Sequence, residues 1–538
     1  MSKQFNFPKE KNYLLVPEMP TPNGRMHLGH LAGPYLKMDI LRRKAERGGG
    51  KAFVVSGSDV FESYVELKAS QLGIGTEDVC NKFHPQIIKD LEALKIHFDF
   101  FLNPLDEQWR ARFFKREKEL MQQLTDAGVV EEREEDLIYD PVNERFLNGC
   151  WIKGTCPNCG SGTGSYLCET CGTHYRPSDI FDAATYPDAR VIKGTALYLK
   201  LDTKKLFDKV EKMEINSVFA DILKRYVELQ GPYIRLTTPQ ATGVEWEWGA
   251  DKKQVLFTYS ALLFFSVFCG DICKEQFDLP IHPFDAASDF TTIASFGIDN
   301  AIPYLAGVLA GGMELPGLKA FDYYLSNHFY YLNGEKFSTS RIHVIWGSDI
   351  VHLAQVQPDV VRYYLARQNP ELEKKNFDVS EFITVVNEEL FVRYNNVLKE
   401  AFAVLPQLPG EAPDDKWCAA LQSLIAEQNS FLNPPGFNLA DALHPVDEWM
   451  DRFDGWDAAE RKLYAYWWLK GFALLAYPFM PDISTALWNR LSDETELTID
   501  HFFSGNKIVR QPVEDILFKE VSYTQMEKCL PESIKVNP

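Results

Sequence analysis

The sequence lacks any stretch of about 20 uncharged apolar residues, the length that a membrane-spanning helix needs. Its first residues contain no apolar run before a small-residue cleavage site, so they do not form a secretory signal. No internal repeat and no low-complexity tract is present. These absences exclude a helical membrane protein and a repeat array, and they predict a cytoplasmic globular protein with no membrane partner.

Positive charge is also scarce, because 56 Lys and Arg residues stand against 76 Asp and Glu residues and give a net charge of −20. A polyanionic partner must therefore be held by a local basic patch against a repulsive overall field. Composition alone neither supports nor excludes nucleic-acid binding. The 538 residues, 45% of them hydrophobic, suffice for three or four globular domains of about 150 residues each.

Cysteine is sparse, and most of it has no pattern. Six of the ten cysteines show no framework spacing, as expected in a reducing compartment. The other four form two Cys-x-x-Cys pairs separated by eight residues: Cys156, Cys159, Cys168 and Cys171. Four thiolates at this spacing can close tetrahedrally on one zinc ion, and they leave no open position for catalysis. The sequence therefore predicts a structural zinc site.

Apolar runs on both sides of a helical pattern predict the start of a doubly wound sheet. Residues 11–16 and 52–56 are typical of buried parallel strands, and the helix expected between them ends at Gly48. Strand patterns return at 255–259 and 323–332. The predicted fold class is α/β, a Rossmann-type doubly wound parallel sheet with a zinc-bearing insertion, followed by an all-α helical domain.

The rest of the chain is mostly helical in pattern. Residues 77–126 and 385–500 are predicted to form helices, and the insertion is expected over about 120–245. The last residues form a tail and not a further domain.

The segment PTPNGRMHLGH, Pro20 to His30, directly follows the first apolar run. A helix that begins after a buried strand offers free backbone N–H groups to phosphates. His27 and His30 can donate hydrogen bonds to phosphate oxygens, and Gly29 leaves room for a nucleotide against the backbone. The alternative interpretation is a solvent-exposed turn with two incidental histidines.

A second candidate segment is GEKFSTSR, Gly334 to Arg341. A loop that carries Lys336 and two serines, Ser338 and Ser340, can close over a triphosphate and neutralise departing pyrophosphate. The alternative interpretation is an ordinary polar loop.

In this order, the two segments resemble the two signatures of class I aminoacyl-tRNA synthetases. Further stretches narrow the resemblance to the methionyl-tRNA synthetase family. These are VPEMPTPNGRMHLGH, WIKGTCPNCG with YLCETCGTHYRP, and PDVVRYYLARQNP after the second signature. The similarity extends from about residue 11 to about residue 500.

The resemblance implies a division of the chain into six segments. They are the first half of a Rossmann catalytic domain, a connective insertion with the zinc knuckle, the second half of the catalytic domain, a stem-contact segment, a helical domain resembling an anticodon-binding domain, and a tail. Their expected limits are 1–120, 121–250, 251–345, 346–385, 386–520 and 521–538.

The resemblance also implies a reaction. An amino acid attacks the α-phosphate of Mg²⁺-bound ATP, pyrophosphate leaves, and the aminoacyl group of the adenylate passes to the 3′-terminal adenosine of a tRNA. His27, His30 and Lys336 would act on the triphosphate, and Asp59 would hold the α-ammonium group. The other ATP-binding positions implied are Asn23, Gly29, Gly297, Asp299, Ser338 and Ser340, with Gly297 and Asp299 at the ribose. No appended module for dimerisation follows, so a monomer is expected.

The amino-acid side of the site departs from the family. Positions where the family places its side-chain pocket carry Met19, Thr21, Tyr259, Ser266, Tyr304 and Val308, with Glu18 adjacent. A hydrophobic pocket distinguishes neighbouring side chains by only about 1–3 kcal/mol, so several changes together can redirect it to another substrate.

The anticodon end departs as well. The family reads the anticodon with an asparagine, an arginine four residues later and a stacking tryptophan. Here Asn396 keeps the first position, Glu400 replaces the arginine, and either Trp449 or Trp456 fills the third. A carboxylate repels RNA phosphates and cannot fork onto a base edge.

Three hypotheses follow. The chain activates methionine and charges tRNA with an unusual pocket, or it adenylates a different amino acid and delivers it to a small molecule or carrier protein. The third is a zinc-bearing binding protein with a dead site, against which the retained His27, His30, Lys336, Asp59 and Asp299 argue.

Overall fold

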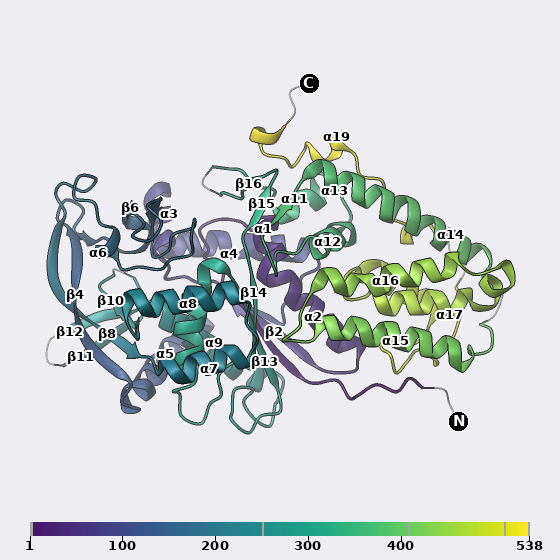
Figure 1. Ribbon diagram of the computed structural model, residues 1–538, viewed down its shortest axis with the longest axis horizontal. Helices are drawn as coiled ribbons and strands as arrows, with labels where there is room; N and C mark the ends of the chain where they lie inside the picture. Colours follow the sequence, from purple (N-terminus) through teal and green to yellow (C-terminus); the bar gives the residue numbers. More distant parts are fainter. Residues whose placement is uncertain are drawn as a thin grey trace.

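A five-stranded parallel sheet forms the centre of the protein in a computed structural model (Figure 1), which describes residues 4–240, 242–249, 252–339, 341–406, 409–509 and 513–535. Its strand order is β14-β13-β1-β2-β3. Strands β2 and β3 are added on one side of β1, and β13 and β14 on the other, so the order of strand addition reverses between β1 and β13. In this fold, ligands bind beyond the carboxyl ends of the strands at such a reversal. The strands are β1 (Tyr13–Pro17), β2 (Ala52–Gly57), β3 (Phe100–Leu102), β13 (Thr291–Gly297) and β14 (Tyr323–Asn327).

Both faces of the sheet are buried, as the continuous apolar runs predict. Alternate residues of β1 enter different cores: Tyr13 and Leu15 lie in one, and Leu14 and Val16 in the other. Helices that connect the strands and cover these faces are α1 (Leu28–His30), η1 (Leu31–Tyr35), α2 (Leu36–Arg47), α3 (Ser63–Leu72), α4 (Thr76–Ala93), α5 (Glu107–Asp126), α9 (Thr258–Gln276), η3 (Ile298–Asn300), η4 (Pro303–Leu309) and α10 (Ala310–Gly312).

The insertion between α5 and α9 builds sheets of its own, at the left of Figure 1. Strands β4 (Val130–Asp140), β5 (Arg145–Phe146), β8 (Arg190–Lys200) and β9 (Tyr233–Arg235) form one sheet, and β10 (Thr237–Thr238), β11 (Glu245–Trp248) and β12 (Lys252–Leu256) form another. The zinc-knuckle hairpin and the remaining helices are β6 (Lys153–Thr155), β7 (Gly162–Gly164), η2 (Gly149–Trp151), α6 (Pro177–Ile180), α7 (Thr203–Lys212) and α8 (Ser217–Gln230).

Two details of the predicted elements are wrong. The strand expected at 255–259 belongs to the β10-β12-β11 sheet and ends at Leu256, because α9 begins at Thr258. The helix expected over 77–126 is divided by β3, which completes the central sheet. Strand β3 is only three residues long, and a short apolar run does not distinguish a strand from a helix.

The C-terminal half is helical, as predicted, and lies at the right of Figure 1. A small sheet of β15 (Tyr330–Leu332), β16 (Glu335–Lys336) and β17 (Lys375–Phe377) lies at its start, with the first two helices between β16 and β17 in the chain. The helices are α11 (Gly347–His352), α12 (Pro358–Arg367), α13 (Val379–Val386), η5 (Asn387–Tyr394), α14 (Asn395–Ala403), α15 (Asp415–Leu432), α16 (Leu439–Asp454), α17 (Ala458–Ala476) and α18 (Pro481–Leu491). None of the described helices is long and apolar enough to cross a bilayer.

Buried arginines join the helical half to the sheet. Arg362 of α12 pairs with Asp39 of α2 at 2.8 Å, and neither side chain is exposed. Arg362 also donates to the carbonyl oxygens of Pro478 and Phe479. Arg47 at the end of α2 donates to the Leu474 carbonyl oxygen of α17. These contacts fix the helices to the element that follows the first signature.

The tail returns to the half of the protein that contains the central sheet. It carries η6 (Glu514–Ile516), α19 (Tyr523–Met526) and η7 (Glu532–Ile534), and α19 lies beside α13 in Figure 1. Ser533 contacts Nδ1 of His343 at 2.8 Å, just after the second signature. The tail therefore supports the second-signature loop.

Candidate active site

The first signature places two imidazoles face to face at the end of β1. His27 caps the helical run that starts at Leu28, and its ring stacks on His30 with the centroids 3.6 Å apart. Nδ1 of His27 accepts the backbone N–H of His30 at 3.3 Å. In the neutral ring, Nε2 then carries the proton and is able to donate a hydrogen bond. Burial, followed by the neighbouring His30, lowers the pKa of His27 and keeps that ring neutral.

Gly29 is required by close approach of the second signature. A side chain at Gly29 would meet Phe337 Cδ2 at 3.0 Å and His27 Nδ1 at 3.1 Å. The Phe337 ring stacks on His27, with the centroids 4.8 Å apart. Residues about 300 positions apart in sequence thus share one site, as the resemblance implied.

Partly buried ion pairs hold the first signature in place. Arg25 contacts Asp90 at 2.7 Å and Asp349 at 2.8 Å. Asp90, which has no exposed surface, also accepts the backbone N–H of Met26. Leu28 N–H donates to the Ile345 carbonyl oxygen. The histidines therefore sit on a rigid support, which electrostatic stabilisation of a transition state needs.

The opposite wall of the crevice comes from the end of β13. Gly297 is the last residue of β13, and Asp299 lies in η3 directly after it and is exposed. Glu18, at the end of β1, accepts the N–H of Gly297 at 2.9 Å and the amide of Asn300 at 3.0 Å. Burial, followed by the nearby Asp299, raises the pKa of Glu18. Glu18 thus ties the two strand ends together across the reversal point.

Lys336 lies beside the histidines and has an acidic partner. Its Nζ pairs with Glu169 at 2.8 Å, and Glu169 stands between the last two cysteines of the zinc knuckle. The Lys336 ammonium group also lies 3.9 Å from the Phe329 ring centroid. Ser338 pairs through its backbone with His343, Asn23 donates its backbone N–H to Thr21, and Ser340 lies outside the described residues. A triphosphate at the histidines would compete with Glu169 for the lysine.

Asp59 follows β2 and faces the start of α9. Its N–H donates to the Pro20 carbonyl oxygen at 3.0 Å, and its carboxylate accepts the Thr258 hydroxyl at 3.2 Å. Burial raises the pKa of Asp59 to about 6, although the hydrogen bonds from Thr258 and from the backbone of Phe61 oppose it.

Four of the remaining residues of the expected amino-acid pocket lie on α9 and η4, which pack together, and the other two follow β1. Tyr304 stacks on Phe296 with the centroids 4.9 Å apart, and Val308 is buried one turn later. The Tyr259 hydroxyl contacts His174 Nδ1 of the insertion at 3.2 Å. Ser266 donates to the Leu262 carbonyl oxygen of its own helix. Met19 packs against the same core, and Thr21 is half-buried.

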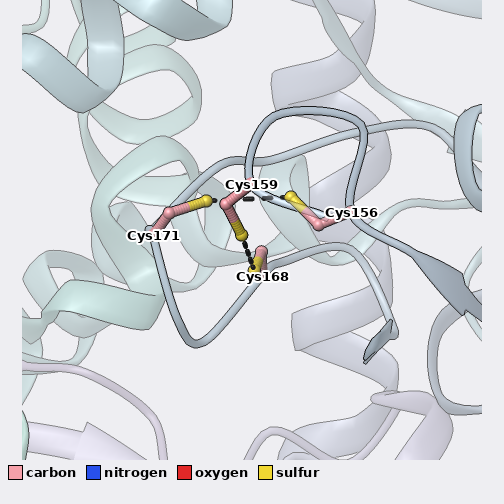
Figure 2. A group of neighbouring side chains, drawn as sticks. All are labelled: Cys156, Cys159, Cys168 and Cys171. Atoms are coloured by element: carbon pink, nitrogen blue, oxygen red, sulfur yellow. Dashed lines mark hydrogen bonds between the residues drawn. The ribbon is translucent and has the colours of Figure 1, made fainter. Parts of the chain in front are cut away.

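The four cysteines come together as the spacing predicts (Figure 2). Cys156, Cys159, Cys168 and Cys171 place their Sγ atoms within 4.8 Å of one another, with two of the separations at 3.7 and 3.6 Å. Zinc–sulfur bonds of about 2.3 Å in a tetrahedron require sulfurs about 3.8 Å apart. The cluster therefore fits a structural zinc ion with four thiolate ligands.

Replacing Cys156 with serine is expected to remove zinc. Cys156 is buried against the small core of the insertion, so a lost thiolate leaves an incomplete site that folding no longer closes. We expect about one zinc per chain to fall to near zero in elemental analysis, with a lower melting temperature. Cys150→Ser, a half-buried cysteine outside the cluster, is the control. Unchanged zinc in Cys156→Ser would contradict the assignment.

Comparison with known proteins places the chain in a family. The family model described as "tRNA synthetases class I (M)" matches residues 13–402. The chain belongs to this family. It is therefore a class I aminoacyl-tRNA synthetase-type ligase, and the resemblance drawn from its motifs is confirmed.

Individual members of the family are distant. The methionine–tRNA ligase of Methanococcus aeolicus is 26% identical over 95% of this chain and 78% of that protein. The ligase of the same name from Roseiflexus castenholzii is 27% identical over 78% of this chain and 73% of that protein. A Mycobacterium tuberculosis methionyl-tRNA synthetase solved with methionyl-adenylate superposes with a TM-score of 0.71 at 16% identity, over 93% of this chain and 99% of that one. The likeness to this solved structure supports the fold.

At the far end of the helical half, the structure separates the two candidate tryptophans. Trp449 is buried, and its Nε1 donates to the Trp468 carbonyl oxygen, so it is a core residue. Trp456 is half-buried beside Arg461, whose Nε donates to the Trp456 carbonyl oxygen. Arg461 also pairs with Glu400. Asn396 is exposed one turn earlier on the same helix.

Sequence reasoning missed the residues that position the site. Arg25, Asp90, Glu169 and Arg461 all act through partners from distant segments. Only Arg25 carried a local signal, as the one charged residue inside the first signature.

Proposed function

We propose that this protein activates an amino acid with ATP as an aminoacyl-adenylate and transfers the aminoacyl group to tRNA. The observation that carries the proposal is the assembly of His27, His30 and Lys336 beyond the carboxyl end of β1, with Asp299 of η3 directly after the neighbouring strand β13. Family membership and the distant methionine–tRNA ligases support the same reaction.

ATP would lie across the reversal between β1 and β13. Its ribose hydroxyls would meet Asp299 and Gly297, and its α-phosphate would lie against Nε2 of His27 and the His30 ring. Developing negative charge at that phosphate is then met by preorganised donors. Lys336, released from Glu169, would neutralise the departing pyrophosphate, together with Mg²⁺ brought by ATP.

Asp59 would hold the α-ammonium group of the amino acid and so aim its carboxylate at the α-phosphate. This contact is charge-assisted only while Asp59 is ionised. The attack depends mainly on the orientation of the two reactants. Asp59 would fix the amino acid and the histidines would fix the α-phosphate, so the carboxylate and the phosphorus are held in line.

The end of the helical half supports a tRNA acceptor. Half-buried Trp456 and the Arg461 guanidinium lie together there, and aromatic rings and guanidinium planes are the groups on which proteins stack unpaired RNA bases. Glu400 pairs with that guanidinium, so RNA binding would require the pair to open.

Two assays test the proposal together. ATP–pyrophosphate exchange that depends on an amino acid measures adenylate formation, and acid-stable label on total tRNA measures transfer. We expect both. Exchange without any labelled tRNA would refute the acceptor, and absence of both would refute the proposal.

The pH dependence of activation should follow Asp59. Its raised pKa, about 6, means that the carboxyl gains a proton as the pH falls through that value. A protonated Asp59 cannot pair with an ammonium group, so kcat/KM for the amino acid should fall about tenfold per pH unit below about 6. The exchange assay from pH 5 to 8 measures it. Asp59→Asn should abolish this fall of kcat/KM below about pH 6. A kcat/KM in the parent enzyme that does not change with pH would contradict the role of Asp59 in holding the α-ammonium group.

Neutralising Glu400 should strengthen tRNA binding. Glu400→Gln removes one negative charge and the ion pair with Arg461, whose guanidinium keeps its bonds to the carbonyl oxygens of Trp456 and Asp454. We expect a change of up to about 1 kcal/mol or about two- to fivefold in Kd. Filter binding of total tRNA measures it. Glu77→Gln, which breaks an exposed pair with Arg110 in the sheet domain, is the matched control. Weaker binding by Glu400→Gln would exclude this face as the RNA site.

A further inference from the structure

A buried carboxylate without a partner lies next to the amino-acid side of the site. Glu117 of α5 is 1% exposed, and neither of its carboxylate oxygens has a hydrogen-bond partner among the described residues. Helix α5 is otherwise ordinary, with Arg116 paired to Asp271 of α9 at 2.7 Å on its outer side. Arg116, which precedes Glu117 in the sequence, is therefore already paired with another carboxylate.

Two phenylalanines in the helical turn before Glu117 contact residues on either side of Asp59. Phe113 and Phe114 lie four and three residues before Glu117, on the same helix face. The Phe114 ring lies 5.8 Å from the ring of Phe61, two residues after Asp59. The Phe113 ring lies 5.9 Å from that of Phe265 in α9.

Phe265 completes the link to Asp59. A side chain added at Gly57, two residues before Asp59, would lie 2.8 Å from Phe265 Cζ. Thr258, which bonds Asp59, begins the same helix α9. Helix α5, which carries Glu117, packs against α9, and α9 carries the expected pocket position Ser266, whose hydroxyl donates to the Leu262 carbonyl oxygen.

Asp59, Glu62 and Glu117 bring negative charge together in this part of the site, and none of the three forms an ion pair within the part of the chain that the structure describes. Asp59 is the charged group that acts on Glu117, and it also acts on Glu62, which follows three residues later. Burial and this repulsion raise the pKa of Glu117. A buried acid with both oxygens unsatisfied costs stability, and a hydrophobic residue of similar size would avoid that cost. Its partner is therefore to be sought in a ligand.

We propose that the amino acid activated by this enzyme carries a cationic group at the end of its side chain, and that Glu117 receives that group. The inference rests on the proposed function, since it assigns the α-ammonium group to Asp59 and the second cation to Glu117. A thioether offers no donor to Glu117, so a methionine side chain would leave the carboxylate unpaired. The substrate class is a basic amino acid, with an amine or guanidine side chain.

Amino-acid-dependent exchange with a defined panel tests the proposal. L-lysine, L-ornithine and L-arginine are compared with L-methionine, L-norleucine and L-glutamine. We expect kcat/KM for one basic amino acid to exceed that for methionine by about 100-fold or more. Glu117→Gln should remove about 100-fold from the basic substrate and little from norleucine. Glu119→Gln, on the exposed face of the same helix, is the matched control and should change neither.

Stability separates a binding role from a structural one. Glu117→Leu should raise the melting temperature of the free enzyme while it abolishes activation of the basic substrate, because the unpaired acid is gone. A lower melting temperature would mean that Glu117 serves the fold, and it would overturn the inference.

The other possible results of the exchange assay also distinguish the substrate inference from the proposed function. Preference for methionine, norleucine or glutamine with normal exchange would overturn the basic substrate and leave the proposed function intact. If no panel member supports exchange, the proposed function loses its support, and thermal shifts by the same amino acids decide about Glu117. Stabilisation by a basic amino acid that Glu117→Gln abolishes would support the cation site, and no stabilisation would overturn it.

Discussion

His30→Ala is expected to lower kcat of amino-acid-dependent ATP–pyrophosphate exchange about 100- to 1,000-fold, the cost of removing one preorganised donor from a charged transition state. His30 is exposed and stacks on His27, and its backbone N–H still reaches Nδ1 of His27 after the change. The fold should therefore be retained, with a melting temperature within about 1 °C of the parent, since exposed substitutions change stability little.

His352→Ala is the matched control, because His352 is an exposed histidine near the end of α11. It should leave exchange unchanged. Exchange by His30→Ala at the parent rate would show that this imidazole takes no part in phosphate chemistry.

Asp39→Ala is expected to destabilise the protein by about 3–5 kcal/mol, because it leaves a buried arginine without its charge partner. Asp39 has no exposed surface and pairs with both Arg43 and Arg362. Arg362 keeps its carbonyl acceptors from the helical half, but no carboxylate replaces Asp39 within hydrogen-bond reach among the residues that the structure describes. The midpoint of urea unfolding measures the loss.

The double variant Asp39→Ala, Arg362→Met should recover part of that stability, since it removes both buried charges. Asp126→Ala, an exposed aspartate bonded to Gln122, is the control and should change little. A loss below about 1 kcal/mol in Asp39→Ala would show that this pair does not join the two halves of the protein.

The sequence predicted those parts of the site that depend on local pattern. The Cys-x-x-Cys pairs and the strand before Pro20 are each set by spacing within a short segment, and the structure contains both as predicted. The stacking of His27 on His30 was not predicted. Strand β3 and the end of the 255–259 segment were mispredicted, because short apolar runs fit either a strand or a helix and tertiary pairing decides between them.

Partners from distant segments could not be predicted. Nothing near Lys336 points to Glu169, and nothing near Glu400 points to Arg461. Glu117 is the extreme case, because its helix has ordinary amphipathic spacing in which a glutamate is expected on the solvent side. Only its burial without a partner makes it a candidate for substrate binding.

The most direct test of adenylate formation is recovery of the adenylate itself. The enzyme is incubated with Mg²⁺, ATP, pyrophosphatase and a mixture of L-amino acids that includes ornithine, and protein-bound small molecules are identified by mass spectrometry after gel filtration. The account predicts about one aminoacyl-adenylate per chain, with a basic amino acid, and none in His30→Ala after the same short incubation. ATP or AMP alone on the parent enzyme, with no adenylate, would contradict it.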